Sequence, residues 1–236
     1  MKRLWPLCAV ALFLAACSSS TPQTHPTPAP TKLADKTAED ILDAATAAMT
    51  AKGSVHIVTT ASGGKNRLIQ IVNDTGPDSG RQVITGAGMR VEIRLVASIA
   101  YLRANQVGLA NFIGFPLSQA RLLADKWLTF TSGENGYNDL VESLDMPSLI
   151  ADVRLTGALT KTAVTTIEGR AVIGIKGKGR LGGADMLHVA TEGDPLPVEE
   201  TNTDKGEVDT SLFSRWGETV KVTAPAGAIS GPGVVA

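Results

Sequence analysis

Hydrophobic and polar residues follow two different periods along the chain. Between residues 37 and 53 the apolar positions recur at the spacing of a helix: Ile41, Leu42, Ala45, Ala48 and Met49. Thr37, followed by two acidic residues, is typical of a helix start, and Gly53 is a natural stop. We therefore expect one amphipathic helix at the beginning of the folded part.

From residue 55 the period changes to two residues, which predicts strands. The clearest run is 89–95, where apolar residues alternate with charges of both signs, so one face of this strand should be dry and the other wet. Glycine-rich turns between the early runs predict antiparallel hairpins. The expected strands are 55–60, 67–72, 82–85, 89–96, 99–103, 127–130, 153–159, 163–167, 171–176, 185–190, 197–202, 207–213 and 219–223.

The alternation is interrupted in the middle of the chain. Residues 104–126 favour helix and loop, and 138–144 and 147–151 favour short helices, the second with proline in its first turn. Helix, strands, helices and strands in one domain predict an α+β fold with a large curved antiparallel sheet. Helices on the concave side of that sheet would either fill its hollow or leave it open, and this choice decides the function.

The amino-terminal residues have the three zones of a secretory signal. Lys2 and Arg3 precede an apolar run of about a dozen residues, against the roughly 20 that a permanent membrane span needs. The run ends in Leu14-Ala15-Ala16-Cys17, which resembles the bacterial lipobox. This resemblance implies cleavage between Ala16 and Cys17 and a diacylglyceryl group on the Cys17 thiol. We expect residues 1–16 to be a signal peptide and the protein to be lipid-anchored on the extracytoplasmic face of the cell membrane.

Residues 17–34 are rich in serine, threonine and proline and offer almost nothing to bury, so they predict a tether behind the lipidated cysteine. Residues 35–226 then form a single domain, and 227–236 a flexible tail. The other cysteine, Cys8, lies in the signal segment, so the mature domain would have no disulfide.

Composition and charge exclude several classes of function. The chain holds 22 Lys+Arg and 23 Asp+Glu, and loss of the signal peptide changes its formal charge from −1 to −3. The chain therefore has no excess of positive charge for binding nucleic acid. Residues 177–182 match G-x-G-x-x-G, but a strand rather than a helix follows them, so no dinucleotide site is expected. The three histidines have no metal-ligand spacing, and no nucleophile motif is present. We therefore expect a monomer that is not an enzyme and has no metal or cofactor.

The chain as a whole resembles the actinobacterial (mycobacterial) LppX/LprG-type envelope lipoproteins. The resemblance rests on the lipobox, the proline-rich tether and the order of several short strings: 54–57, 100–103, 125–128, 167–169, 193–198 and 213–225. It implies a half-barrel of antiparallel strands wrapped around helices, similar to periplasmic lipoprotein carriers, with an apolar cavity. Better-known members of the family hold acylated glycolipids or long-chain envelope lipids.

Two functions follow, and the sequence leaves both open. The first is a carrier, in which a lipid or glycolipid fills a hollow lined by the apolar faces of the strands, with a mouth or lid formed by the segment after them. The strand residues are Val55, Ile57, Ile69, Ile71, Val91 and Ile93, and the lid residues are Leu109, Phe112, Ile113 and Phe115. The second is a tethered interaction or scaffold domain with a closed core, binding another envelope protein near Phe112 or at a sheet edge. Plain core packing is the alternative for each of the ten residues.

Overall fold

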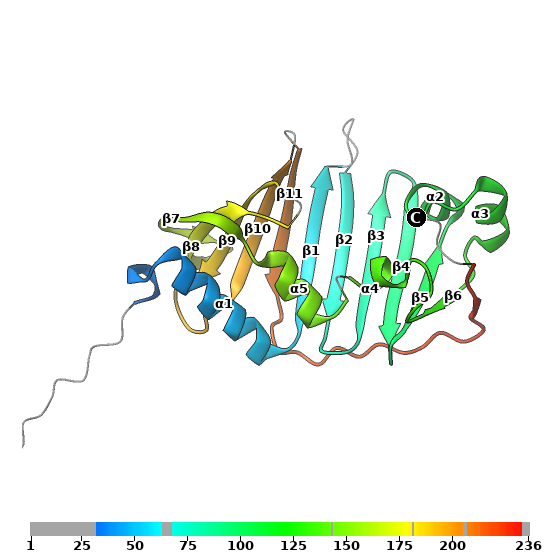
Figure 1. Ribbon diagram of the computed structural model, residues 1–236, viewed down its shortest axis with the longest axis horizontal. Coiled ribbons are helices and arrows are strands. Elements are labelled where there is room, and N and C mark those ends of the chain that lie inside the picture. Colours follow the sequence, from blue (N-terminus) through cyan, green and yellow to red (C-terminus); the bar gives the residue numbers. More distant parts are fainter. Residues whose placement is uncertain (1–31, 63–67, 143, 181, 205–206, 233–236) are drawn as a thin grey trace, which may run out of the picture. The chain divides into compact units, whose positions relative to one another are not determined.

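The described residues form one twelve-stranded sheet with helices against it (Figure 1). The computed structural model describes residues 32–62, 68–142, 144–180, 182–204 and 207–232. They belong to the second of two units into which the chain divides, residues 1–31 and 32–236. Ala16 and Cys17 lie outside the described residues, as does most of the expected tether.

The strands form two consecutive groups along the chain. The first group is β1 (Val55–Ser62), β2 (Leu68–Thr75), β3 (Gly80–Gly86), β4 (Met89–Val96), β5 (Ile99–Ala104) and β6 (Leu128–Thr131). The second is β7 (Thr156–Ile167), β8 (Arg170–Lys178), β9 (Ala184–Ala190), β10 (Pro197–Asp204), β11 (Glu207–Ser214) and β12 (Ile229–Ser230). The helices are η1 (Leu33–Asp35), α1 (Ala38–Lys52), α2 (Gln106–Asn111), α3 (Leu117–Leu123), α4 (Tyr137–Val141) and α5 (Met146–Val153).

The two groups of strands join at β1 and β11. The order across the sheet is β12-β6-β5-β4-β3-β2-β1-β11-β10-β9-β8-β7, so each group is a meander of neighbouring strands. Among the described strands the pairs are antiparallel except β12 with β6, which is parallel. The sheet is open and mixed. The predicted α+β fold with one large sheet is confirmed.

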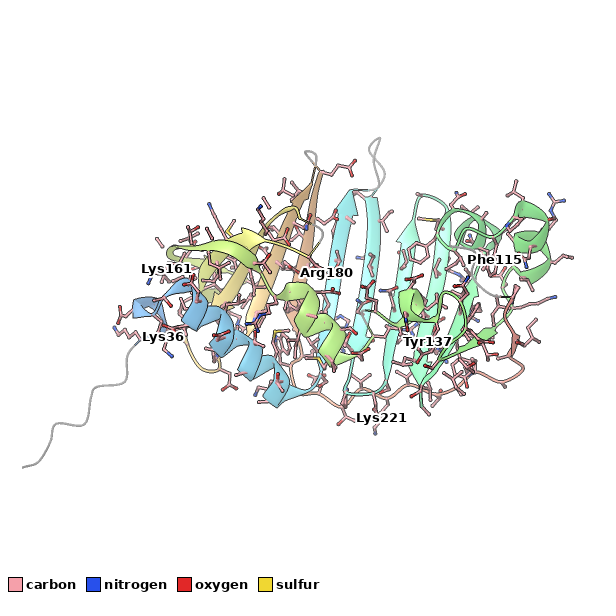
Figure 2. All side chains as sticks on the ribbon, viewed as in Figure 1. Lys36, Phe115, Tyr137, Lys161, Arg180 and Lys221 are labelled. Atoms are coloured by element: carbon pink, nitrogen blue, oxygen red, sulfur yellow. The ribbon has the colours of Figure 1, made fainter. Side chains whose placement is uncertain are left out.

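Helices α1, α4 and α5 lie over one face of the sheet, which we call the helix-covered face (Figure 1). The expected first helix is confirmed: Thr37 Oγ1 accepts a hydrogen bond from Asp40 N at 3.1 Å, and Gly53 ends the helix with φ +70°. Leu33 and Ala34, at the predicted end of the tether, already pack against the core. Lys161 Nζ on β7 holds this entry segment by donating to the carbonyl oxygens of Ala34 and Lys36 (Figure 2).

The helix-covered face carries two separate hydrophobic cores. One lies under α2, α3 and α4 and is built mainly from β3, β4, β5 and β6, with Phe130 and Leu102 fully buried. The other lies under α1 and α5 and uses β1, β8, β9 and β11, with Ile41 and Ile175 fully buried. Between them a strip of the sheet carries polar side chains, among them Thr59, Asn73 and Gln82.

Helix α5 is fixed at its first residues above this strip. Asp145 caps the helix by accepting from Ser148 N at 2.9 Å, and Pro147 stands in the first turn, as the sequence predicts. Met146 N donates to Gly76 O at 3.1 Å, which ties the helix start to the turn between β2 and β3. The position of α5 over the sheet therefore follows from its cap and this one turn.

The expected strands at 153–159 and 163–167 are wrong in their boundaries. Val153 ends α5, and a single strand, β7, runs from Thr156 to Ile167. Its pairing with β8 shifts register twice, between Thr156 and Thr160 and between Lys161 and Val164. These irregularities interrupt the two-residue alternation, which is why the pattern suggests two strands where there is one.

The predictions at the carboxyl end also differ from the structure. Residues 219–223 form no strand; they run extended across the ends of the central strands (Figure 1). The alternation of Val220 and Val222 covers those strand ends instead of joining a ladder, and Pro225 has no N–H to pair. The expected flexible tail 227–236 contains β12, because Ile229 N and Gly231 N donate to backbone oxygens of the otherwise unpaired edge of β6.

Candidate functional site

A cavity opens between the two cores, under α5 and over the middle of the sheet. Its volume is about 170 Å³. The residues that line it come from β1, β2, β3, β10, β11 and α5: Ile57, Thr59, Ile71, Asn73, Gln82, Leu149, Asp152, Val153, Glu200, Ser211 and Phe213. Because polar and apolar side chains share this lining, the central cavity offers both hydrogen bonds and apolar contact.

Asn73 is the most unusual polar residue of the central cavity. Its side chain is only 6% exposed, and its Oδ1 atom has no hydrogen-bond partner among the described residues. It occupies the position on β2 that follows Ile69 and Ile71 on the helix-covered face. A buried amide oxygen without a partner costs free energy, which sets Asn73 apart from ordinary core residues.

Two carboxyl groups face the central cavity from opposite sides, Glu200 from β10 and Asp152 from α5. Burial, reinforced by Asp185 and Asp152, raises the pKa of Glu200 to about 7. Burial also raises the pKa of Asp152, although Arg180 Nε lies 2.6 Å from Asp152 Oδ1 and opposes this (Figure 2). Both carboxyl groups of the lining therefore keep their protons to a higher pH than free carboxyl groups do, and Asp152 is paired with Arg180.

The volume of the central cavity limits what it holds as it stands. Sites for drug-sized molecules begin at about 300 Å³, and a water molecule takes about 30 Å³ of liquid. The space of about 170 Å³ therefore suits one small polar group and not a long acyl chain. Of the two arrangements that the sequence left open, the described residues favour a filled hollow, because α1 and α5 pack over one half of the helix-covered face and α2 to α4 over the other half.

The structure brings together few of the ten residues expected to bind a ligand. Ile57 and Ile71 line the central cavity. The other four strand residues lie on the same face but pack in the two cores or beside them: Val55, Ile69, Val91 and Ile93. Of the expected lid, Leu109, Ile113 and Phe115 (labelled in Figure 2) are core residues, whereas Phe112 is 47% exposed.

The sequence contains a signal for the polar lining that the prediction missed. Asn73 stands in phase with Ile69 and Ile71 on its strand, where a polar side chain points toward the core, whereas Glu200 is in phase with the polar Asn202 and carries no such signal. The expected strand 67–72 ended one residue before Asn73. A polar residue at a strand position where the alternation calls for an apolar one indicates a binding site more strongly than the row of apolar residues does.

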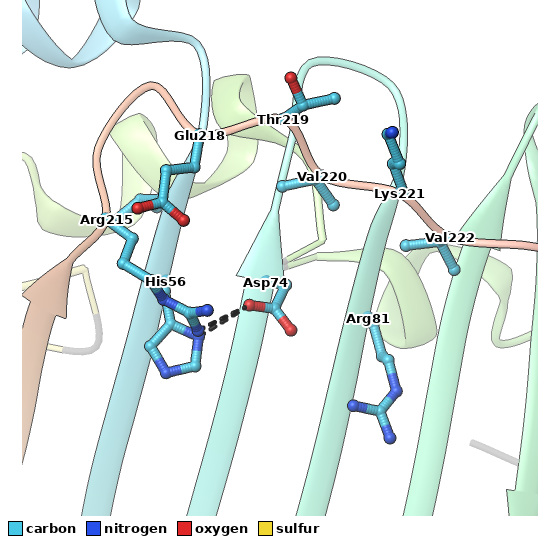
Figure 3. Close-up of a pocket in the computed structure, with 10 residues that line it drawn as sticks. His56, Asp74, Arg81, Arg215, Glu218, Thr219, Val220, Lys221 and Val222 are labelled. Carbon is cyan, nitrogen blue, oxygen red and sulfur yellow. Dashed lines mark hydrogen bonds and ion pairs between the residues drawn. The ribbon is translucent and has the colours of Figure 1, made fainter.

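A second pocket, of about 290 Å³, lies beneath residues 215–222 at the ends of the strands (Figure 3). His56 Nδ1 lies 2.7 Å from Asp74 Oδ1 on the neighbouring strand, and Arg215 Nη2 lies 3.3 Å from the same oxygen. Asp74 is therefore shared between two cationic or proton-bearing groups. The interpretation of His56 as a strand residue held by a neighbour is confirmed.

His188 is likewise a strand residue with an acidic neighbour across the ladder. Its Nδ1 atom lies 3.2 Å from Glu199 Oε1, without the geometry of a hydrogen bond. Burial lowers the pKa of His188 more than Glu199 raises it. In the part of the chain that the structure describes, no three potential metal ligands lie together, and no helix has the length and hydropathy of a membrane span.

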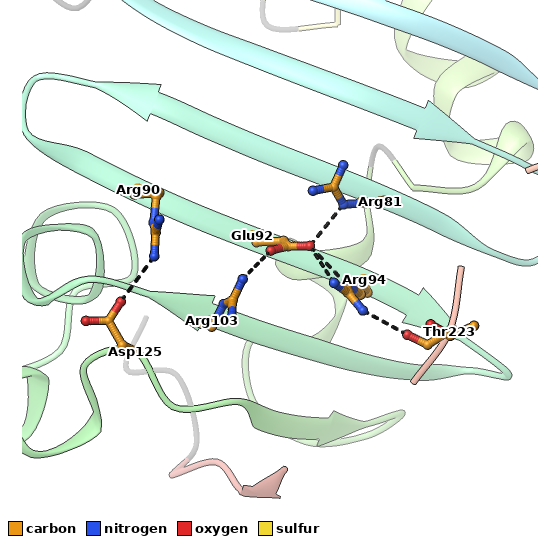
Figure 4. A network of polar contacts seen from close by, with 7 residues as sticks. All are labelled: Arg81, Arg90, Glu92, Arg94, Arg103, Asp125 and Thr223. Carbon is orange, nitrogen blue, oxygen red and sulfur yellow. Dashed lines mark hydrogen bonds and ion pairs between the residues drawn. The ribbon is translucent and has the colours of Figure 1, made fainter. Parts of the chain in front are cut away.

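The outer face of β3, β4 and β5 carries an arginine network around Glu92 (Figure 4). Glu92 is 8% exposed and accepts hydrogen bonds at 2.9–3.0 Å from Arg81, Arg94 and Arg103. Burial alone would raise the pKa of Glu92, but the hydrogen bonds of Arg81 and Arg94 outweigh it and lower the pKa to about 2.

The same network fixes Trp127, at the start of β6. The guanidinium groups of Arg94 and Arg103 each lie 4.7 Å from the centre of the Trp127 ring, within the range of a cation–π contact. The predicted charged face of residues 89–95 is confirmed, but its central acid is buried beneath arginines instead of wet. This cluster locks neighbouring strands together.

The fold is similar to those of two solved mycobacterial proteins. The crystal structure of lipoprotein LppX from Mycobacterium tuberculosis matches with a TM-score of 0.53 and 16% identity, over 79% of this chain and 98% of that one. LprF from Mycobacterium bovis matches with a TM-score of 0.51 and 14% identity, over 80% of this chain and 97% of that one. No family model and no curated protein matches the chain. The resemblance to LppX/LprG-type lipoproteins is thus confirmed at the level of the fold.

Proposed function

We propose that this protein is a lipoprotein of the LppX/LprG type, anchored through diacylglyceryl-Cys17 on the extracytoplasmic face of the cell membrane. It holds an acylated lipid or glycolipid and has no enzymatic activity. The shared fold over four fifths of the chain is the observation that carries this proposal. The lipobox-like residues 14–17 support the anchor independently.

Acyl chains enter where the two cores meet. Leu149 and Val153 of α5 close the central cavity from above, and Ile57 and Phe213 form apolar parts of its floor. The space of about 170 Å³ is too small for an acyl chain, so entry requires α5 to move away from the strip between the cores and to withdraw Leu149 and Val153. An acyl chain that replaces these contacts gains about 25 cal/mol for each Å² of apolar surface it buries.

Native mass spectrometry of the mature chain, extracted in mild detergent from an actinobacterial host, tests the carrier. The expected result is added mass of one diacyl lipid beyond the covalent anchor. Denaturing mass spectrometry of the same sample keeps the covalent anchor and releases bound lipid, which separates the two. A bare protein that also takes up no added diacyl lipid rules the carrier out.

A matched pair of variants assigns the binding to the space under α5. Leu149→Trp fills the central cavity and should reduce the lipid-bound fraction several-fold. Val164→Trp introduces the same tryptophan on β7, at a residue that is 49% exposed, and should leave the bound fraction unchanged. If both variants lose lipid binding equally, or if neither variant loses it, the lipid binds elsewhere.

One observation favours the scaffold function as a second candidate. The central cavity is smaller than ordinary ligand sites, and α2 and α3 expose three apolar side chains: Phe112 at 47%, Leu117 at 67% and Leu122 at 70%. A closed core with such a patch suits an interaction domain of the cell envelope. The triple variant with serine at these positions separates the two functions, because it should leave lipid uptake intact and abolish capture of a protein partner.

A further inference from the structure

The outer face of β3, β4 and β5 holds more positive charge than its acids balance. Four arginines meet two acidic groups there, which leaves a formal charge of +2 (Figure 4). The arginines are Arg81 on β3, Arg90 and Arg94 on β4, and Arg103 on β5, and the acids are Glu92 on β4 and Asp125 before β6. The whole chain has a formal charge of −1, so this excess is local.

The register of the strands brings like charges together. Arg81 on β3 lies opposite Arg94 on β4, and Glu92 lies opposite Arg103 on β5. Like charges directly opposite each other destabilise a sheet, and the single carboxylate of Glu92 offsets one of the three guanidinium charges that contact it. Strand pairing therefore accounts for one of these positive charges and leaves two without a structural role.

A pocket of about 260 Å³ opens on the same face, beside the Glu92 carboxylate. The residues that line it are Arg81, Val83, Arg90, Glu92, Arg103, Ala104 and Asp125. Its walls thus include three guanidinium groups, one from each of three neighbouring strands. Its volume suits a small group better than a drug-sized molecule. We call it the arginine pocket, and it shares no lining residue with the central cavity.

The three arginines of this pocket keep N–H groups that make no hydrogen bond with any described residue. Arg81 uses only Nε and Arg103 only Nη2, each for a bond of 2.9 Å to Glu92. Arg90 Nη2 lies 3.6 Å from Asp125 Oδ1, which is beyond hydrogen-bond distance. Several charged donors therefore remain available at the pocket.

Arg94 is the arginine of the network that does not line the pocket, and all three of its side-chain nitrogens are used. Nε and Nη2 donate to Glu92, and Nη1 donates to the carbonyl oxygen of Thr223. The unused donors of the network are therefore concentrated on the arginine pocket.

The unused donors and the excess charge together indicate an oxyanion as the ligand. Guanidinium groups bind carboxylates and phosphates through pairs of N–H···O bonds. A carboxylate has two oxygens and one negative charge, whereas a phosphate monoester has three acceptor oxygens and a charge of about −1.5 to −2 at pH 7. The phosphate monoester therefore matches three arginines and a local excess of two positive charges better.

We propose that the arginine pocket binds a phosphate monoester through Arg81, Arg90 and Arg103. The bound group would also offset the repulsion among these arginines. The site lies on the opposite face from the central cavity, so it does not depend on the carrier function. Two sources present the same chemistry: soluble phosphate esters, and the headgroup of phosphatidic acid at a membrane surface.

Isothermal titration calorimetry of the mature chain in nonionic detergent tests the site with a probe from each source. The soluble probe is glycerol 3-phosphate, with glycerol as its uncharged match. The lipid probe is detergent micelles that contain phosphatidic acid, with diacylglycerol micelles as their match. Glycerol 3-phosphate should bind with a Kd of about 1 mM or lower, the affinity expected from two charge-assisted hydrogen bonds. Glycerol should not bind.

Three variants locate the binding. Arg90→Gln should weaken the binding of both phosphate probes about tenfold. Asp125→Asn removes one of the two acids that line the pocket and should strengthen binding about threefold, a gain that partial unfolding would not produce. Arg170→Gln, at an exposed arginine where β8 begins, is the matched control and should leave binding unchanged.

The outcomes decide both the site and its source. Binding of neither phosphate probe overturns the site, as does an equal loss in Arg90→Gln and Arg170→Gln, which would indicate attraction to the general charge of the surface. Phosphatidic acid that binds equally well to Arg90→Gln lies elsewhere on the chain and also overturns the site. If Arg90→Gln weakens the binding and Arg170→Gln does not, the site is supported, and the probe that binds more tightly identifies the source.

Discussion

Glu200 on β10 and Asp152 on α5 line the same cavity, one from the sheet and one from the helix above it. Each lies in a setting that raises its pKa, and Asp152 contributes to the shift of Glu200. Ionising both at once therefore costs free energy at the junction of helix and sheet. The contact of α5 with the sheet should weaken as these groups lose their protons.

The contribution of Glu200 to the stability of the chain should fall as pH rises from about 5 to about 7.5, whereas that of His188, whose pKa burial lowers, should rise over the lower part of this window. The unfolded chain releases the Glu200 proton near the ordinary pKa of 4.5, while the folded chain keeps it to about 7. The folded state therefore binds more protons in this window, and the free energy of unfolding decreases by up to about 3 kcal/mol. Urea unfolding at several pH values measures this slope.

Glu200→Gln should remove most of that slope, because glutamine keeps the size of the side chain and cannot ionise. Glu192→Gln is the control, since Glu192 is exposed. Glu92 does not affect the slope between pH 5 and 7.5. The stability that its lowered pKa contributes is fully present above pH 4.5 and is lost only as pH falls toward 2. An unchanged slope in Glu200→Gln would show that other groups cause it.

Asn73→Leu should make the protein more stable. Leucine is close in size to asparagine and removes a buried acceptor that has no partner, so the free energy of unfolding should rise by about 1 kcal/mol. Urea unfolding beside a control at an exposed residue of α4, Asn138→Leu, which should change it by less than about 0.5 kcal/mol, tests this. A clear loss of stability would mean that Asn73 is satisfied in solution and is an ordinary structural residue.

Glu92→Gln should destabilise the sheet more than the loss of an exposed acid does. It leaves three arginines around a neutral amide, and we expect a loss of about 2 kcal/mol or more in the free energy of unfolding. Asp125→Asn breaks the exposed pair with Arg90 at 3.6 Å and should cost at most about 0.5 kcal/mol. Equal effects would show that the Glu92 network adds nothing beyond a surface contact.

Cys17→Ser should abolish the membrane anchor. We expect the variant to move to the aqueous fraction or to remain uncut, because the hydroxyl replaces the thiol that carries the diacylglyceryl group. Fractionation followed by labelling with radioactive fatty acid measures both effects. Label that still enters this variant would assign the lipid to another residue.

Strand positions could be predicted where alternation is regular. The strand 89–96 and the first helix have the expected bounds to within one residue, because Met89 to Leu95 and Ile41 to Met49 each keep a single period. The period fails in β7, where two register shifts break it, and at 219–223, where Val220 and Val222 alternate without a ladder. Alternation reports which side a residue faces, not whether another strand lies beside it.

The site was less predictable than the fold. Apolar residues such as Val91 and Ile93 look the same in sequence whether a cavity or a helix covers them, and here the helices do. The cavity instead depends on Asn73, Glu200 and Asp152, which lie far apart in the chain and meet through the pairing of β1 with β11 and the position of α5. That long-range pairing has no local signature.

Both margins of the sheet are covered or irregular. At one, β12 pairs with β6 and is followed by Pro232; at the other, β7 is broken by its two shifts of register and held by Lys161 to the entry segment. Under the proposed lipid anchor, copies of the protein would diffuse in two dimensions and collide often. With no long straight run of free backbone groups at either margin among the described strands, such collisions should separate again, and a crowded membrane should not seed ribbon-like aggregates of this protein.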